Sequence, residues 1–141
     1  MRIKEIKTHK EISQTFPTMS QLYENLDDKT YLDDVSKLMQ QDYLMAGVFE
    51  SDEKKCIGVV GIKITKNLQH GKAMEIQDFM IAEDQRGIGV GKMLMHWVEG
   101  QAANFDCKII SGNLETKRLE SQKIFSREGF ILDGFSFRKI F

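Results

Sequence analysis

The chain has 141 residues, of which 41% are apolar and 29% charged, so we expect one domain with a substantial core. Lysine plus arginine (20) nearly balances aspartate plus glutamate (21), which gives no support for a nucleic-acid-binding protein. No apolar run could span a bilayer, no signal-peptide core follows Met1–Glu5, and two cysteines make neither a disulfide framework nor a metal motif. We therefore expect a soluble, cytoplasmic protein with no membrane, metal or nucleic-acid partner.

The N-terminal part predicts an edge strand followed by helices. Residues 1–7 carry Ile3 and Ile6 and predict the short strand. From residue 10 to residue 41, apolar residues recur every three or four positions, which indicates helices. Pro17 is the only proline and predicts an interruption, so we expect two helices here. These residues are expected to be core, although part of the segment could form one wall of a substrate cleft.

Three antiparallel strands are predicted in the middle of the chain. The segments 43–50, 56–64 and 73–81 are rich in β-branched and apolar residues, and the connections 51–55 and 66–72 are polar. A doubly wound nucleotide-binding fold would alternate strands with helices. Three consecutive strands therefore disfavour that fold.

Two helices and three short strands are predicted to complete the chain. A helix runs from Gly91 to about residue 104, a strand covers 108–111, and a second helix covers 116–128, with Gly129 as its C-terminal cap. Residues 130–133 and 135–141 predict two strands that close the sheet.

A glycine-rich turn links the third strand of the meander to the next helix. Glycines permit a tight bend and a close approach of the backbone, and a helix N-terminus offers free N–H groups and the positive end of the dipole. This pattern predicts an anion site, most simply for a phosphorylated cofactor. The turn reads Arg86, Gly87, Ile88, Gly89, Val90, Gly91 and Lys92.

The spacing of the glycines excludes two common phosphate loops. A dinucleotide fingerprint would need glycine at Lys92, and a Walker A loop would need glycine at Arg86 and a hydroxyl at Met93. The remaining alternatives are a different coenzyme loop or a strand-to-helix turn that holds no ligand.

The sequence R-x-x-G-x-G after a strand resembles the coenzyme A pyrophosphate loop of the GNAT superfamily of N-acetyltransferases. A second stretch, 111–130, is similar to a family helix: Ser121 stands at a small-residue position, Ile124 and Phe125 at an aromatic pair, and Gly129 precedes Phe130. The resemblance covers nearly the whole chain. It implies an α/β (α+β) fold with a mixed, mostly antiparallel central sheet flanked by helices and a splayed strand pair at the cofactor site.

The resemblance also implies a chemistry. Acetyl-CoA would be the co-substrate, and a primary amine of a small molecule or peptide would attack its thioester directly. The backbone of Met80 and Ile81 would pair with the pantetheine, and the Met80 N–H would face the thioester carbonyl oxygen. The residues that the resemblance places against the coenzyme are Met80, Ile81, Arg86, Gly87, Ile88, Gly89, Val90, Gly91, Lys92, Ser121 and Phe125.

Two carboxylates on the strand before the loop are candidates for the general base. Glu75 and Asp78 are three residues apart, so strict alternation puts them on opposite faces unless a bulge re-aims the strand. Either carboxylate could act through water. A third open alternative is that neither of them is the base. His70 and His96 are weaker candidates, because one lies in a polar loop and the other on a helix next to Trp97.

Two positions depart from the family pattern. Phe125 stands where many members have a tyrosine and cannot donate a proton, so water or the hydroxyl of Ser121 would have to protonate the leaving thiolate. Arg118 stands where asparagine is common and could reach a coenzyme phosphate or face solvent.

Two alternatives to an enzyme remain open. Phe125 and the unassigned base motivate a non-catalytic coenzyme A-binding module. The other alternative is a structural or interaction domain whose glycine loop holds nothing. The predicted C-terminal strands could also pair or swap between subunits, so a homodimer is one expectation.

Overall fold

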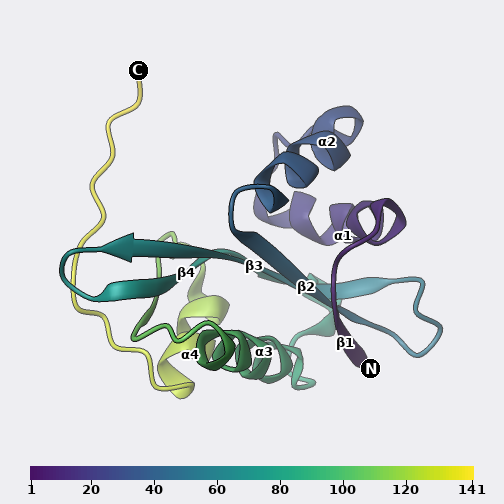
Figure 1. The fold of residues 1–141 in the computed structure, drawn as a ribbon. Helices are drawn as coiled ribbons and strands as arrows, with labels where there is room; N and C mark the ends of the chain where they lie inside the picture. The colour runs from purple at the N-terminus through teal and green to yellow at the C-terminus, as the bar shows by residue number, and fades with distance from the viewer.

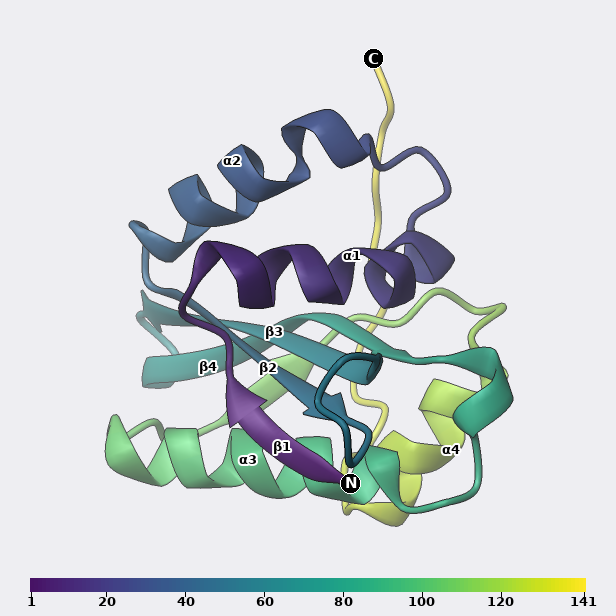
Figure 2. The ribbon, with the colours of Figure 1, turned by 90° about the vertical axis from the view of Figure 1, so that its right-hand side faces the viewer.

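The computed structural model describes residues 1–141 and shows a five-stranded sheet between two pairs of helices (Figures 1 and 2). The strand order is β1-β2-β3-β4-β5; the first four strands are antiparallel, and β5 lies parallel to β4. The strands are Arg2–Glu5 (β1), Tyr43–Phe49 (β2), Cys56–Asn67 (β3), Gly71–Ile81 (β4) and Ile110–Gly112 (β5). The helices are His9–Leu22 (α1), Asp28–Met39 (α2), Val90–Asn104 (α3) and Leu119–Arg127 (α4), with a 3₁₀ turn at Glu83–Gln85 (η1).

The two N-terminal helices are confirmed, but the break between them is not at the proline. The side chain of Thr8 accepts a hydrogen bond from the Glu11 N–H, and the Glu11 carboxylate accepts one from the Thr8 N–H, which fixes the start of α1. Pro17 lies inside α1, where buried Ile12 and Met19 on either side of it pack in one core cluster. Tertiary burial therefore outweighs the local cost of the proline.

The sheet is buried on both faces, which explains why its central strands read as continuous apolar runs. Helices α1 and α2 cover one face, and α3 and α4 cover the other (Figure 2). The core under α1 and α2 includes Ile12, Met19, Tyr31, Val35, Tyr43 and Val59. The core under α3 and α4 includes Val60, Met74, Ile76, Phe79, Leu94, Val98 and Phe125.

The end of α4 has the predicted glycine cap. Gly129 has φ +91° and donates its N–H to the Ser126 carbonyl at 3.2 Å, while Phe130 donates to the Phe125 carbonyl at 3.0 Å. This pair of bonds is the Schellman arrangement, and it satisfies carbonyls that the helix end would leave free.

The two C-terminal strands are not formed, contrary to the prediction from the sequence. Residues 130–141 contain no strand, and the segment extends away from the body of the molecule (Figures 1 and 2). Phe135 is 88% exposed and Phe137 is 92% exposed. Alternation of apolar residues indicates a strand, but a strand also needs a hydrogen-bonding neighbour, and the segment has none within this chain.

Substituting one buried glycine tests how closely α3 packs on the sheet. A Cβ at Gly58 of β3 would overlap Cγ1 of Val90, the first residue of α3, whereas a Cβ at Gly100 of the same helix would meet nothing within 4 Å. We expect Gly58→Ala to lower the free energy of unfolding by about 1–3 kcal/mol, because overpacking a core forces it to shift. Gly100→Ala is expected to raise it by about 0.5–1 kcal/mol through helix propensity. Urea unfolding of both variants checks this, and equal stability of Gly58→Ala and wild type would contradict the close packing.

Candidate active site

The glycine loop follows η1 and delivers the chain into α3. Gly87 and Gly89 adopt φ values of +85° and +88°, a conformation that residues with a side chain rarely take. Gly89 is the N-cap of α3, and no side chain caps the helix at this end. The first-turn N–H groups therefore have no capping partner and are available, with the helix dipole, to an anion.

The third glycine brings three elements together. A Cβ at Gly91 would lie 2.8 Å from Cδ1 of Ile124 on α4 and 3.2 Å from Cδ1 of Ile81 on β4. Only glycine permits this approach without a shift of the neighbouring side chains. The loop and α4 consequently form two walls of one groove.

The groove is a cavity of about 550 Å³ bounded by the end of β4, the loop and α4. Among its 17 lining residues, a single carboxylate, that of Glu120, faces six cationic side chains. The whole chain has a net charge of −1, so the sequence concentrates positive charge here. The six cations are Arg86, Lys92, Lys117, Arg118, Lys123 and Arg127.

The edge of β4 opens beside this groove. Strand β5 pairs with β4 only at Met74, Glu75 and Ile76, and beyond Ile76 no strand pairs with β4 on that side, although the Gln77 carbonyl accepts a hydrogen bond from the Tyr23 hydroxyl. The predicted splay of this strand pair is therefore present. It leaves a row of peptide groups at the groove that another extended chain could pair with.

The register of β4 directs Met80 away from the open edge. Ala82 donates its N–H to the Ile57 carbonyl at 2.9 Å, and in the same register Met80 lies opposite Val59. Peptide groups of an antiparallel strand alternate in direction, so the Met80 N–H points toward β3. The N–H groups of Phe79 and Ile81 face the open edge, and the expectation that Met80 would present its N–H there is corrected.

A bulge in β4 causes this change of direction. Ile62 lies opposite Ile76, but Gly61 lies opposite Asp78, which leaves Gln77 as the extra residue. Glu75 stands between two residues of the core under α3 and α4, so it points to the opposite face. Asp78 lies on that same face, where it contacts Tyr23 just after α1. Strict alternation would have separated the two carboxylates; the bulge places both toward α1 and α2.

Asp78 is held by two tyrosines. Tyr23, just after α1, donates its hydroxyl to Oδ1 of Asp78 at 2.5 Å, and Tyr43 of β2 donates to Oδ2 at 2.6 Å. The absence of a side chain at Gly61 makes room for this, because a Cβ there would overlap the Tyr43 hydroxyl and lie 2.6 Å from Oδ2. The carboxylate is thereby fixed, while each oxygen keeps a further lone pair for another donor.

These contacts and burial change the acidity of the tyrosines. Burial, followed by the charge of Asp78 and its hydrogen bond, raises the pKa of Tyr23 and of Tyr43. Burial also raises the pKa of Tyr31 to about 12, although its hydrogen bond with Thr15 works in the opposite direction. All three tyrosines of the chain therefore keep their protons well above neutral pH.

A second, smaller cavity of about 200 Å³ lies on the other side of the open edge. Its lining includes Tyr23, Gln77, Phe79 and Leu114, and Arg118 lines both cavities. The two cavities therefore share a wall where β4 and the segment after β5 diverge.

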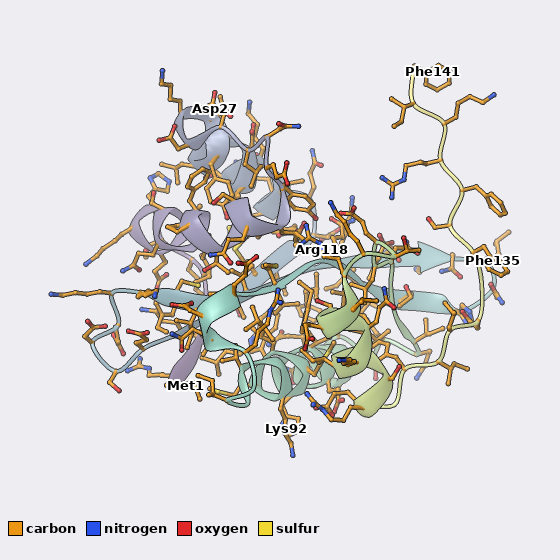
Figure 3. The ribbon with its side chains drawn as sticks, turned by 180° about the vertical axis from the view of Figure 1, so that it is seen from behind. Met1, Asp27, Lys92, Arg118, Phe135 and Phe141 are labelled. Atoms are coloured by element: carbon orange, nitrogen blue, oxygen red, sulfur yellow. The ribbon has the colours of Figure 1, made fainter.

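Arg118 is the side chain at that shared wall. It donates from Nη2 to the Leu22 carbonyl at 2.8 Å, and its Nε is buried without a partner. Figure 3 places it between the end of α1 and α4, while Lys92 points outward from α3. Arg118 thus ties α1 to the start of α4 and does not simply face solvent.

The remaining predicted residues fall in different environments. Ser121 lines the groove, whereas Phe125 lines neither cavity and packs against Phe79 and Phe130, with ring centroids 5.3 and 4.8 Å apart. His70 lies in the β3–β4 turn, and His96 is exposed on α3. Neither histidine lines either cavity.

The matching family model identifies the chain. The model of the acetyltransferase (GNAT) family matches residues 8–130, and the chain belongs to this family. An uncharacterised N-acetyltransferase of Bacillus subtilis, YhdJ, is 23% identical over 141 residues, covering 99% of this chain and 98% of that protein.

Two solved structures share the fold. The ribosomal-protein-alanine N-acetyltransferase of Brucella melitensis has a TM-score of 0.84 at 15% identity and covers all of both chains. The aminoglycoside N-acetyltransferase AAC(6')-Iy in complex with CoA has a TM-score of 0.84 at 18% identity, covering 98% of this chain and 93% of that one. No helix of the present structure is both long and apolar enough to cross a membrane.

The raised pKa values of the three tyrosines predict how the protein behaves in alkaline solution. The folded pKa values lie above the unfolded value of about 10, so between these values the folded state holds protons that the unfolded state releases. The contribution of the three tyrosines to the free energy of unfolding is therefore fully present below about pH 10, and it is lost as the pH rises toward their pKa values in the folded protein. Ultraviolet titration at about pH 10 should therefore detect almost no tyrosinate in the folded protein, whereas about half of the three tyrosines should be ionised in the denatured protein. An ordinary pKa for Tyr23 or Tyr43 in the folded protein would contradict the hydrogen-bonded arrangement around Asp78.

Proposed function

We propose that this chain is an acetyl-CoA-dependent N-acetyltransferase that acts on a primary amine of a small molecule or peptide. The observation that carries the proposal is the open edge of β4, with the cationic groove on one side and the cavity that contains Tyr23 on the other. Membership of the acetyltransferase family and the name of the Bacillus subtilis relative support the same reaction. The CoA complex of the structurally similar aminoglycoside enzyme supports the choice of coenzyme.

The groove fits the charge and shape of the coenzyme. The first-turn N–H groups of α3 and the nearby cations suit a pyrophosphate and a further phosphate. Gly91 lets the start of α3 pack closely against Ile81 and Ile124, which holds the walls of the groove together. When bound, acetyl-CoA would supply an acetyl thioester that an amine can attack directly.

The chain's own groups would act at the open edge. The N–H of Phe79 faces that edge and is the donor best placed for the thioester carbonyl oxygen, with Ile81 N–H two residues further along. Asp78 would accept the proton of the attacking amine, directly or through one water. Glu75 lies on the same face but further from the opening, so we assign it a lesser role.

The group that protonates the leaving thiolate differs from the family pattern. Phe125 is buried among aromatic rings and has no proton to give. Ser121 lines the groove and is one candidate, and water is the other. Acetyl transfer without a proton donor at position 125 is consistent with the proposal, because the leaving thiolate is a weaker base than an alkoxide and needs protonation less.

The first prediction of this proposal concerns coenzyme binding. We expect acetyl-CoA to bind with micromolar affinity and Gly89→Glu to abolish detectable binding, since a side chain at φ +88° strains the loop and adds negative charge to the anion site. Gly100→Glu is the matched control, because it places the same charge at an open position of the same helix. Calorimetry checks this; wild type that fails to bind would exclude both the enzyme and the coenzyme-binding module.

The second prediction of this proposal concerns turnover of an amine. With a panel containing an aminoglycoside, a polyamine, amino acids and a peptide with N-terminal alanine, we expect acetylation of at least one amine above the spontaneous rate. Asp78→Asn should lower kcat by roughly 10²–10⁴-fold without weakening coenzyme binding, because it removes the proton acceptor. Glu75→Gln is the comparison and should lower kcat much less. Coenzyme binding with no turnover of any amine would favour the non-catalytic module, and an unchanged kcat in Asp78→Asn would exclude that residue as the base.

A further inference from the structure

The guanidinium of Arg118 has a positive charge that no anionic group of the structure neutralises. Its Nη2 donates to the Leu22 carbonyl at 2.8 Å, its Nε is buried without a partner, and none of the ion pairs includes this residue. Burying a charge is costly unless an opposite charge or several hydrogen bonds compensate it. Arg118 therefore retains a buried donor and its charge for an anion that binds beside it.

The smaller cavity that Arg118 lines is positively charged. A second guanidinium, that of Arg138, lines the same cavity and also takes part in no ion pair. The only carboxylate in the lining is that of Glu115, and it lies 3.6 Å from the ammonium group of Lys117. An anion in this cavity would thus meet two unpaired cations and one carboxylate that already has a partner.

Tyr23 connects this cavity to the proposed base. Its hydroxyl donates to Asp78, and Tyr23 lines the cavity together with Arg118. Burial is the main cause of the raised pKa of Tyr23, but the charges of Asp78 and Glu115 raise it further and the charge of Arg118 lowers it. All three charges therefore act on one hydroxyl. The cavity offers opposite charges to the two ends of one small ligand.

The phosphates of the coenzyme are expected at the glycine loop rather than at Arg118. The other five cations of the groove do not line the smaller cavity, and together with the loop they suit those phosphates. Phe79, whose N–H is the donor assigned to the thioester, lines the smaller cavity with Arg118. The pantetheine and thioester of the coenzyme are uncharged, so they bring no anion to this cavity. The acceptor is the remaining source of one.

We propose that the acceptor carries an oxyanion (a carboxylate, phosphate or phosphonate) close to its amine, and that Arg118 binds this group in the smaller cavity. At about 200 Å³, the cavity is smaller than those of roughly 300–1,000 Å³ that hold drug-sized ligands, so it suits a compact amine. The inference rests on the proposed function, because it names the class of acceptor. Arg118 determines specificity and transfers no proton.

This arrangement would orient the acceptor for the transfer. With its oxyanion on Arg118, the acceptor would present its neutral amine toward Asp78 and the open edge of β4. Attack of the nitrogen on the thioester carbon forms the C–N bond, the C–S bond then breaks, and the amine proton passes to Asp78 while the sulfur leaves as a thiolate. A polyamine or an aminoglycoside would place a positive charge against Arg118, so both should be poor acceptors.

Pairs of amines with and without an oxyanion test the proposal. Glycine is compared with glycinamide, and phosphoethanolamine with ethanolamine, which distinguishes a carboxylate from a phosphate as the bound group. We expect wild type to have a kcat/KM at least about tenfold higher for the member with the oxyanion, in one pair or in both. A preference in one pair alone identifies the group. Equal kcat/KM within both pairs, or turnover of neutral or cationic amines alone, would overturn the proposal.

Substituting Arg118 tests the residue itself. Arg118→Met removes the guanidinium, whereas Arg118→Gln removes the charge but keeps an amide that can donate to the Leu22 carbonyl. Both should reduce the ratio of kcat/KM between the two members of a preferred pair by about 10–100-fold, through KM for the member with the oxyanion. Lys123→Met is the matched control, because Lys123 lines the groove and not the smaller cavity. It should weaken coenzyme A binding and leave that ratio unchanged.

The possible outcomes separate this inference from the proposed function. Coenzyme A binding without turnover of any amine would overturn the proposed function and this inference with it. Turnover without a preference that depends on Arg118 would overturn the inference alone. If Arg118→Gln weakens coenzyme A binding and leaves the ratio between acceptors unchanged, the arginine serves the coenzyme and the inference is wrong.

Discussion

The structure depends on where β4 stops pairing with β5. Beyond Ile76 no strand pairs with β4 on that side, so the N–H groups of Phe79 and Ile81 remain free at the edge. Backbone groups at a free edge need partners, which water supplies in the empty cavities and an extended ligand could supply in its place. The glycine loop and the groove lie beside this opening, and Tyr23, which bonds to Asp78, lines the smaller cavity there.

The cationic groove and the carboxylate of Asp78 lie in environments of different charge. The groove has six cations and one carboxylate, whereas Asp78 is hydrogen-bonded by two neutral hydroxyls and makes no ion pair. A base that paired with a cation would bind protons weakly, because the positive charge favours the carboxylate. Five of the six groove cations line only the groove, and Arg118, which lines both cavities, bonds to the Leu22 carbonyl and makes no ion pair with Asp78.

The sequence predicts the local features well and the long-range ones poorly. The loop and the start of α3 at Val90 follow from glycine spacing and helical periodicity, which are local signals. The bulge at Gln77 depends on register with β3, so the direction of the Met80 N–H was not readable. Tyr23 and Tyr43 meet Asp78 from 55 and 35 residues away, and no local pattern marks them. The segment 135–141 has the alternation of a strand, but the pattern could not show that it pairs with no other strand of the structure.

The central claim is that the open edge of β4 binds the coenzyme as a neighbouring strand would. Residue-resolved amide hydrogen exchange by NMR, with and without coenzyme A, tests it most directly. The account predicts that coenzyme A slows exchange at the N–H groups of Phe79 and Ile81 by about tenfold or more, because they gain hydrogen-bond partners, while Met80, already directed at β3, changes little. Unchanged exchange at Phe79 and Ile81 on saturation with coenzyme A would contradict the account.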